Sequence, residues 1–285
     1  MTAAISYEPR MFQKPSATPS TAPGTDWVVT GSHATLLAEV RRVSTALILF
    51  VAAVSIACQR SRPSSEAGPP PSAGAEPRAG HYMGRRIAPT MSHEGAGWLV
   101  RPEREAEESA ARMLRELRLQ AGDVACDVGA GNGYHTLEMA KMVAPRGRAI
   151  AVDIQPEMLR LLEERAQAAH VANVQTLLGT SADPKLPAGT CDLILLSDVY
   201  HELDDPAAML GHLERALSAR GVLALLEFRA EDPGVPIKPE HRMSKKQILL
   251  ELGASGFEEV RSFDELPWQH LMFFAPRKRH TGSRR

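Results

Sequence analysis

The amino-acid sequence predicts an α/β fold built on a doubly wound, mostly parallel β-sheet. From Val124 onward, short apolar runs alternate with segments of helical periodicity, which is typical of this class. One run, Cys191–Ser197, is almost wholly apolar, as expected of a strand that helices cover on both faces. A glycine-rich turn follows the first run. Because such sheets bind ligands at the carboxyl ends of their strands, we expect the functional site at that edge.

The turn after the first strand has a specific pattern. An apolar strand leads into an acid and three glycines spaced two residues apart, and a helix-forming run follows: Asp127, Gly129, Gly131, Gly133 and then Thr136–Ala140. Glycines let the backbone approach a ligand closely, and the start of a helix offers free N–H groups. A dinucleotide-binding fingerprint would need its third glycine at position 134, where this chain has Tyr134.

The following elements continue the alternation. Ala149–Asp153 reads as a strand whose terminal acid, about 20 residues after the glycines, is placed to accept hydrogen bonds from ribose hydroxyls. A helix with Pro156 in its first turn comes next. Further strands are expected at 173–178, 191–197 and 222–227, and two strand-like segments, 257–265 and 269–276, end the pattern.

With its acid ahead of the glycines, the turn resembles motif I of class I S-adenosylmethionine-dependent methyltransferases, and the resemblance extends over residues 81–276. That family has a seven-stranded Rossmann-like sheet whose last strand is antiparallel, which the final strand pair matches. The chain looks most similar to small-molecule methyltransferases related to the ubiquinone and menaquinone C-methyltransferases. The resemblance implies S-adenosylmethionine as cofactor and methyl transfer to an unidentified small-molecule acceptor.

The resemblance also implies a set of cofactor contacts. Asp127 would face the methionine ammonium, or instead fix the loop as a structural acid. Asp153 would hold the ribose, cap the following helix, or do both. Asp183 lies where the family contacts adenine, but Pro184–Lys185 stretches the usual spacing, so a plain loop role is equally open. The expected cofactor-binding residues are Asp127, Gly129, Gly131, Gly133, Asp153, Ser181, Asp183 and Asp198.

Candidate catalytic residues follow the fourth strand, where the family places groups that face the transferring methyl: Tyr200, His201 and Glu202. His201 is expected to act as a general base because imidazole titrates near neutrality, or else to serve as a helix cap. Substrate contacts are expected from an N-terminal lid, residues 81–119 with a helix at 102–119, and from the ends of later strands: Arg85, Glu227, Arg229, Trp268 and His270. A solvated role is the alternative for Arg85. No metal site is expected, since Glu231–Asp232 reads as a solvated loop.

The first 80 residues differ from the rest of the chain in composition and lack its alternation of strands and helices. Residues 1–40 are expected to be disordered or to precede the true start, and residues 59–80 form a proline-rich linker. Between them, Arg41–Arg42 and an apolar run of about 15 residues that ends before Cys58 are typical of a secretory signal. Ser55–Cys58 resembles a bacterial lipobox, which predicts a lipid-anchored envelope protein. The alternative is a buried or interfacial helix in a protein that stays in the cytoplasm, the compartment in which S-adenosylmethionine is made.

Composition limits the remaining possibilities. A chain of 285 residues with 44% hydrophobic content can bury a full core, and a net charge of −1 does not favour nucleic acid as a partner. Residues 277–285 form a basic tail that is expected to be solvated. Cys126 and Cys191 are expected about 15 Å apart, too far for a disulfide. Two alternative functions stay open: a non-catalytic envelope lipoprotein that uses the fold as a binding module, and a protein side-chain methyltransferase.

Overall fold

The computed structural model describes residues 80–277. The expected N-terminal extension, the signal segment with Cys58, nearly all of the linker and the basic tail lie outside the described residues, so these remain predictions. Within residues 80–277, no helix combines the length and the apolar character needed to cross a membrane.

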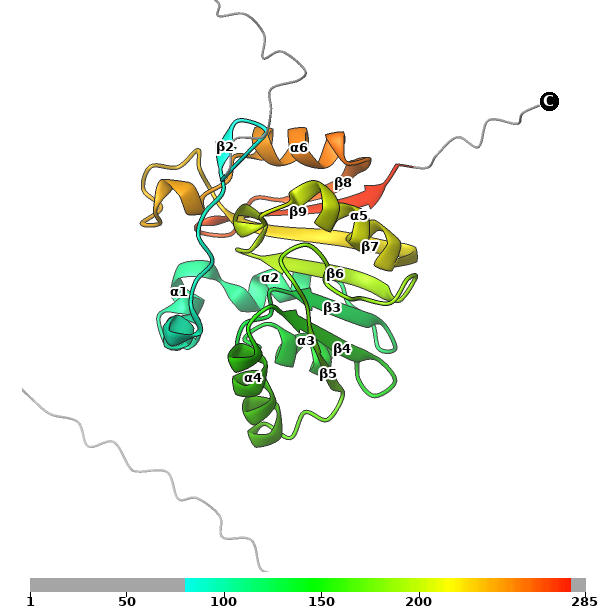
Figure 1. Ribbon diagram of the computed structural model, residues 1–285. Helices are drawn as coiled ribbons and strands as arrows, with labels where there is room; N and C mark the ends of the chain where they lie inside the picture. Colours follow the sequence, from blue (N-terminus) through cyan, green and yellow to red (C-terminus); the bar gives the residue numbers. More distant parts are fainter. Residues whose placement is uncertain (1–79, 278–285) are drawn as a thin grey trace, which may run out of the picture. The chain divides into compact units, whose positions relative to one another are not determined.

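A seven-stranded sheet forms the centre of the described chain (Figure 1). Its order is β5-β4-β3-β6-β7-β9-β8, with β9 antiparallel to both of its neighbours and the other strands parallel. β3 pairs with both β4 and β6, so the winding direction changes beside β3, where ligands of such sheets bind. The predicted fold class is confirmed. The strands are β3 (Val124–Val128), β4 (Arg148–Asp153), β5 (Val174–Leu178), β6 (Cys191–Ser197), β7 (Leu217–Phe228), β8 (Phe257–Phe263) and β9 (Gln269–Pro276).

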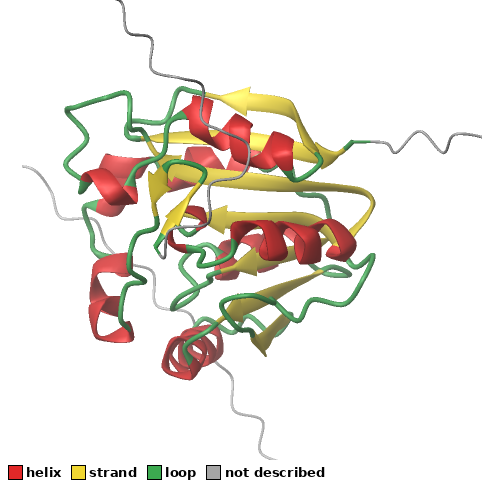
Figure 2. Cartoon of the chain, turned by 45° about the horizontal axis from the view of Figure 1, so that its top comes forward, coloured by secondary structure: helices red, strands yellow, loops and turns green. Residues whose placement is uncertain are grey.

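Helices flank both faces of the sheet (Figure 2), because alternate strand residues point to opposite sides. Ala125 and Leu193 pack with one set of helices, whereas Cys126 and Ile194 pack with the other. Both faces are therefore apolar, as the composition of β6 predicted. One face carries α2 (Ala110–Glu116), α3 (Thr136–Val143) and α4 (Pro156–Ala168), and the other carries α5 (Pro206–Ala216) and α6 (Lys245–Ala254).

The N-terminal segment runs from beside α6 past the carboxyl ends of the strands (Figure 1). It consists of β1 (His81–Tyr82), β2 (Arg85–Arg86), the 3-10 helix η1 (His93–Val100) and α1 (Arg104–Glu108). The prediction of one helix over 102–119 is wrong, because Ser109 adopts left-handed backbone with φ 54° and separates α1 from α2. This break lets α1 bury Arg104 and Glu108 while α2 packs Met113 and Leu117 on the sheet.

Cys126 and Cys191 form a disulfide, which corrects the expectation of two separate thiols. Both lie on the face that α5 and α6 cover. Ile194 lies opposite Cys126 in the β3–β6 pairing, so two regular strands would keep Cys191 well away. However, the pairing of β6 with β7 is irregular between Cys191 and Leu193, and the two cysteine Cα atoms are 5.9 Å apart. The expectation failed because it assumed regular geometry from the first residue of β6.

Candidate active site

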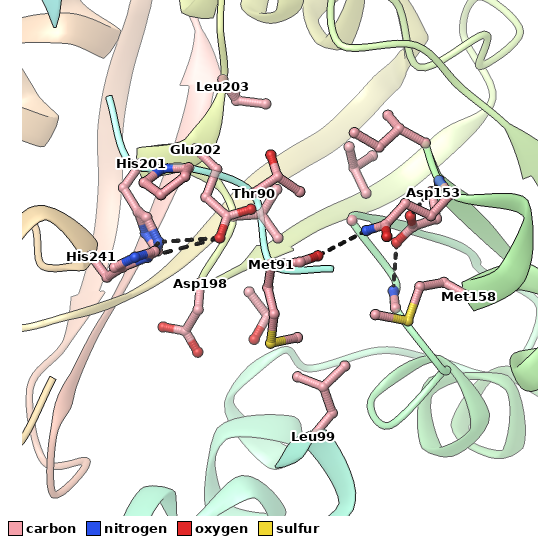
Figure 3. Close-up of a pocket in the computed structure, with 18 of the residues that line it drawn as sticks. Thr90, Met91, Leu99, Asp153, Met158, Asp198, His201, Glu202, Leu203 and His241 are labelled. Atoms are coloured by element: carbon pink, nitrogen blue, oxygen red, sulfur yellow. Dashed lines mark hydrogen bonds and ion pairs between the residues drawn. The ribbon is translucent and has the colours of Figure 1, made fainter. Parts of the chain in front are cut away.

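A cavity of about 660 Å³ opens at the carboxyl ends of β3, β4 and β6, as the topology predicts (Figure 3). The N-terminal segment forms one wall of it. Its 3-10 helix η1 is held in place because the side chain of Asn132 donates to the carbonyl of Ala96 at 2.8 Å. Gln155 also joins this segment to the sheet, accepting from the backbone N–H of His93 and donating to the carbonyl of Met91. Much of the lining is apolar and includes Met91, Trp98, Leu99, Met158, Met209 and Ile237.

The glycine loop lies against this cavity, and its backbone conformation and close packing favour glycine over residues that carry a Cβ atom. Gly129 and Gly131 line the cavity, and both have positive φ, +77° and +54°. A Cβ atom on Gly131 would lie 2.8 Å from Cδ1 of Leu99, in the N-terminal segment. Gly133, also at positive φ, packs instead against Leu162 of α4 and does not line the cavity. Two of the three predicted loop glycines therefore line the cavity.

Asp153 lies at one end of the cavity (Figure 3). Oδ2 accepts the backbone N–H of Gly131 at 2.8 Å, and Oδ1 accepts that of Gln155 at 2.9 Å. Burial raises the pKa of Asp153, and these backbone donors oppose the shift. The carboxylate thus ties the glycine loop to the end of β4 and has lone pairs left for hydroxyl groups of a ligand.

Asp127 lies under the loop, outside the cavity lining. It is almost completely buried, and its Oδ2 accepts the hydroxyl of Thr136 at 2.6 Å. Burial raises its pKa to about 6, even though the Thr136 hydrogen bond acts in the opposite direction. The contact of Asp127 with a ligand ammonium stays a prediction.

Asp198 lines the cavity with an incomplete hydrogen-bond set. Its Oδ2 accepts from Nε2 of Gln269 at 2.8 Å, whereas its Oδ1 is buried without a partner. Burial and the neighbouring carboxylates of Glu108 and Glu227 raise the pKa of Asp198. A cationic or hydroxyl-bearing ligand would supply the missing donor.

The predicted adenine-side residues separate in the structure. Ser181 lines the cavity, together with Thr180. Asp183 does not: its carboxylate accepts from the Lys185 side chain at 2.8 Å and lies 3.3 Å from Nδ1 of His212.

His201 lies at the opposite end of the cavity from Asp153 (Figure 3). Its Nδ1 is 2.6 Å from Oε2 of Glu227, which is fully buried, and its Nε2 is 3.1 Å from Nδ1 of His241. A carboxylate only accepts, so in the neutral ring Nδ1 carries the proton. Nε2 is then unprotonated and can accept a hydrogen bond. Burial disfavours charge on His201, but Glu227 outweighs it, so the pKa of His201 is raised.

Glu202 and His241 complete this end of the site. Oε1 of Glu202 lies 3.9 Å from Nε2 of His201 and 3.8 Å from Nδ1 of His241. Burial raises the pKa of Glu202 to about 7, and burial together with His201 lowers that of His241. His241 comes from the short helix η3 (Pro239–His241), and Met243 just beyond it pairs with the end of β7.

Several predicted catalytic and substrate residues do not reach the cavity. Tyr200, in η2 (Tyr200–Glu202), is fully buried behind it. Glu227 is also outside the lining and contacts Nδ1 of His201 and the backbone N–H of Tyr200. The guanidinium of Arg85 bonds the buried carboxylate of Glu251 at 2.7 Å and the carbonyl of His201 at 3.0 Å. The remaining three are also absent from the lining: Arg229 bonds backbone carbonyls, His270 pairs with Glu231, and Trp268 lies in the β8–β9 turn.

Sequence comparison agrees with this geometry. Residues 119–264 match the family described as "Methyltransferase domain", which is more than half of the chain. The chain belongs to this methyltransferase family. Over 120 residues it is 31% identical to the protein-L-isoaspartate O-methyltransferase of Ignicoccus hospitalis, which covers 42% of this chain and 54% of that protein. It is 25% identical over 157 residues to the demethylmenaquinone methyltransferase of Staphylococcus carnosus, covering 55% and 63%. The chain thus spans less than two thirds of these curated relatives.

A solved structure shares the fold of this methyltransferase. The S-adenosylmethionine-dependent methyltransferase of Aquifex aeolicus superposes with a TM-score of 0.62 at 25% identity, over 65% of this chain and 98% of that one. The predicted enzyme class and the predicted cofactor, S-adenosylmethionine, are confirmed at the level of the family.

The geometry of the methyltransferase site, taken apart from the comparisons, also fits S-adenosylmethionine. The glycine loop leaves no room for side chains at its two cavity positions, and the partnerless Oδ1 of Asp198 needs a donor. Asp153 and the loop would hold the ribose end, while Asp198 would face the donor groups of the amino-acid part. When bound, the cofactor supplies a methyl group on a sulfonium.

Arg104 and His241 are two of the cavity residues of this methyltransferase that the sequence analysis did not single out. Arg104 lines the cavity and is held by Glu108 at 2.8 Å and by the carbonyl of Leu99. His241 lies in a segment without periodicity, next to Pro239 and Arg242. Neither position carries a local pattern, and only the contact with His201 identifies His241.

Proposed function

We propose that this methyltransferase transfers the methyl group of S-adenosylmethionine to a small, largely apolar acceptor. The observation that carries the proposal is a single cavity with the glycine loop and Asp153 at one end and His201 with Glu202 at the other (Figure 3). Apolar side chains line the space between these ends, which suits an acceptor with a ring or a hydrocarbon chain. The similarity to a demethylmenaquinone methyltransferase supports a quinone-like acceptor.

The residues of this chain mainly position the acceptor and transfer its proton. Methyl transfer from a sulfonium is an in-line displacement, so aligning the acceptor with the methyl is the main task of the enzyme. The apolar walls offer water few hydrogen-bond partners along this line. The free Nε2 of His201 can take the proton of an acceptor hydroxyl, amine or acidic carbon, and Glu227 stabilises the charged ring.

Cofactor binding tests the first half of this proposal. Asp153→Ala should weaken binding of S-adenosylmethionine and of its demethylated product by ten- to a hundredfold, because a hydrogen bond to a charged acceptor contributes about 1.5–3 kcal/mol. Glu157→Ala, which removes an exposed acid of the next helix, is the matched control. Calorimetry that gives equal affinities for Asp153→Ala and wild type would remove Asp153 from the site.

An acceptor screen tests the second half. Demethylated quinols, small phenols and amines, and an isoaspartyl peptide are each incubated with the protein and methyl-labelled cofactor. The peptide is included because the 31%-identical relative acts on L-isoaspartate, which would make this chain a side-chain methyltransferase. Label transfer to the peptide alone would contradict the small-molecule proposal.

We further propose that the chain is exported and anchored through a lipidated Cys58. The lipobox-like Ser55–Cys58 supports this, and so does the Cys126–Cys191 disulfide, because disulfides persist mainly in oxidising compartments. A diacyl anchor holds a protein at a membrane stably. Mass spectrometry of protein from the native host should find chains that begin at a modified Cys58. An unmodified peptide across Ala57 and Cys58, abundant in the soluble cytoplasmic fraction, would overturn this proposal.

A further inference from the structure

Three potential metal ligands, two from the helix η2 and one from the helix η3, converge at the acceptor end of the cavity. They are Nε2 of His201, Oε1 of Glu202 and Nδ1 of His241, and all lie within 4.8 Å of one another. Figure 3 shows the three side chains pointing toward a common point. The nearest point equidistant from the three atoms lies in their plane, about 2.1 Å from each, which is the distance that zinc keeps to imidazole nitrogen and carboxylate oxygen.

The contacts behind these ligands add an independent observation. Metal-binding histidines usually donate their other ring N–H to a carboxylate or carbonyl, which fixes the tautomer. His201 does so: its Nδ1 is 2.6 Å from Oε2 of the fully buried Glu227, whose Oε1 accepts the N–H of Tyr200. The nitrogen left over is the one that faces Glu202 and His241.

The local charge also suits a cation. Glu202 and the nearby Glu227 and Asp198 place carboxylates around this end of the cavity. The nearest guanidinium, that of Arg85, is paired with the buried Glu251. These carboxylates can supply the charge that balances a divalent ion.

We propose that His201, Glu202 and His241 bind a divalent first-row transition ion at the acceptor end of the cavity. Two imidazoles favour such an ion over Mg²⁺ or Ca²⁺, which prefer oxygen ligands. Three protein ligands leave coordination positions open toward the cavity, as in catalytic zinc sites. The proposal rests on the proposed function only for its chemical role: with Nε2 of His201 bound to the ion, the ion in place of the free base would hold an oxygen, nitrogen or sulfur atom of the acceptor beside the methyl donor.

The same three residues allow a different arrangement. The 3.1 Å contact between His201 and His241 can be a simple hydrogen bond, with the pair passing a proton from the acceptor to solvent. That arrangement needs no ion and should show no selectivity among cations. A direct measurement of metal binding therefore distinguishes the ion site from the proton-transfer pair.

The test uses the full chain, stripped of metal by chelation and dialysis. Titration with Co²⁺ should give visible absorption bands that saturate near one equivalent, and Zn²⁺ should displace them. His241→Ala, at a half-buried position, should weaken Zn²⁺ binding more than about a hundredfold, and Glu227→Gln should weaken it about ten- to a hundredfold. The matched control is His170→Asn, an exposed histidine at the end of α4, which should bind like wild type.

Two results would overturn the proposal: no saturable Co²⁺ bands in the wild type, or equal Zn²⁺ affinity in wild type and His241→Ala. The comparison with His241→Ala also controls for Zn²⁺ binding by histidines and cysteines outside residues 80–277, because the two proteins differ only at position 241. Calorimetry with S-adenosylmethionine on the same samples keeps the two proposals apart. Cofactor binding without metal binding leaves the proposed function standing, and metal binding without cofactor binding leaves the ion site standing.

Discussion

His201 and Glu227 form a buried pair in which Nδ1 of the ring lies 2.6 Å from the carboxylate. The other oxygen of Glu227 accepts the backbone N–H of Tyr200 at 2.8 Å. One carboxylate at the end of β7 thus orients both the imidazole and the backbone that carries it. This geometry presents Nε2 to the cavity whether the nitrogen receives a proton or binds an ion.

The first prediction concerns this tautomer. We expect a low-field, slowly exchanging Nδ1–H proton resonance from His201, because the hydrogen bond is short and charge-assisted. It should disappear in His201→Ala and move upfield in Glu227→Gln, where the acceptor is neutral. Glu202→Gln, which changes the group facing Nε2, should leave it in place. Nuclear magnetic resonance of labelled protein makes the measurement, and the same resonance persisting in His201→Ala would refute the assignment.

Turnover should depend on His201 more than cofactor binding does. Once an acceptor is known, His201→Ala should lower turnover by about 10²–10⁴, the usual contribution of a positioned general base. Its affinity for S-adenosylmethionine should stay near that of wild type, because the ring lies at the opposite end of the cavity from Asp153. Near-normal turnover in the variant would reduce His201 to a packing residue.

The glycine loop gives a third prediction. Gly131→Ala should lower cofactor affinity, because its Cβ would meet Leu99 at 2.8 Å and displace the N-terminal segment. Gly189→Ala is the matched control: it has a similar φ of +64° but open space around it. Both variants should lose about 1 kcal/mol of stability from left-handed backbone, but only Gly131→Ala should bind the cofactor more weakly. Adding Leu99→Ala should restore part of the lost affinity, and equal binding by both glycine variants would contradict the steric argument.

The elements that sequence predicted well are those with local signals. The strand, glycine turn and helix around Asp127 follow from apolar runs and residue types within a short window. The position of Asp153 follows from the parallel alternation, because neighbouring parallel strands end at the same edge. The alternation of strands and helices therefore predicts the edge of the sheet at which the cavity opens.

The acceptor end could not be predicted in the same way. His241 meets His201 across 40 residues of chain, and the segment that carries it has no periodicity. Arg85 was expected in the cavity, but a buried acid on α6, Glu251, holds it behind His201. The Cys126–Cys191 disulfide depends on an irregular strand start. Each of these contacts arises from packing between distant segments, for which a single sequence gives no local sign.

The Arg85 contact leads to a fourth prediction, about stability. Arg85→Ala should lower the free energy of unfolding by about 3 kcal/mol, because it leaves the buried carboxylate of Glu251 without its charge partner. Arg86→Ala, at the exposed neighbouring position, should change it by less than about 0.5 kcal/mol. Urea unfolding of the two variants measures the difference. Equal losses would mean that Arg85 does not stabilise the segment beneath His201.

The last prediction concerns pH and Asp127. Burial raises the pKa of this carboxyl from 3.8 to about 6, so the folded state favours the protonated form. The resulting stabilisation is complete below about pH 4 and is lost as the pH rises through 6. Asp127→Asn cannot ionise, and its amide oxygen can still accept from Thr136. The stability of wild type relative to this variant should therefore fall by up to about 3 kcal/mol between pH 4 and 7. Urea unfolding across that range tests it, and a pH-independent difference would show that folding does not raise the pKa of Asp127.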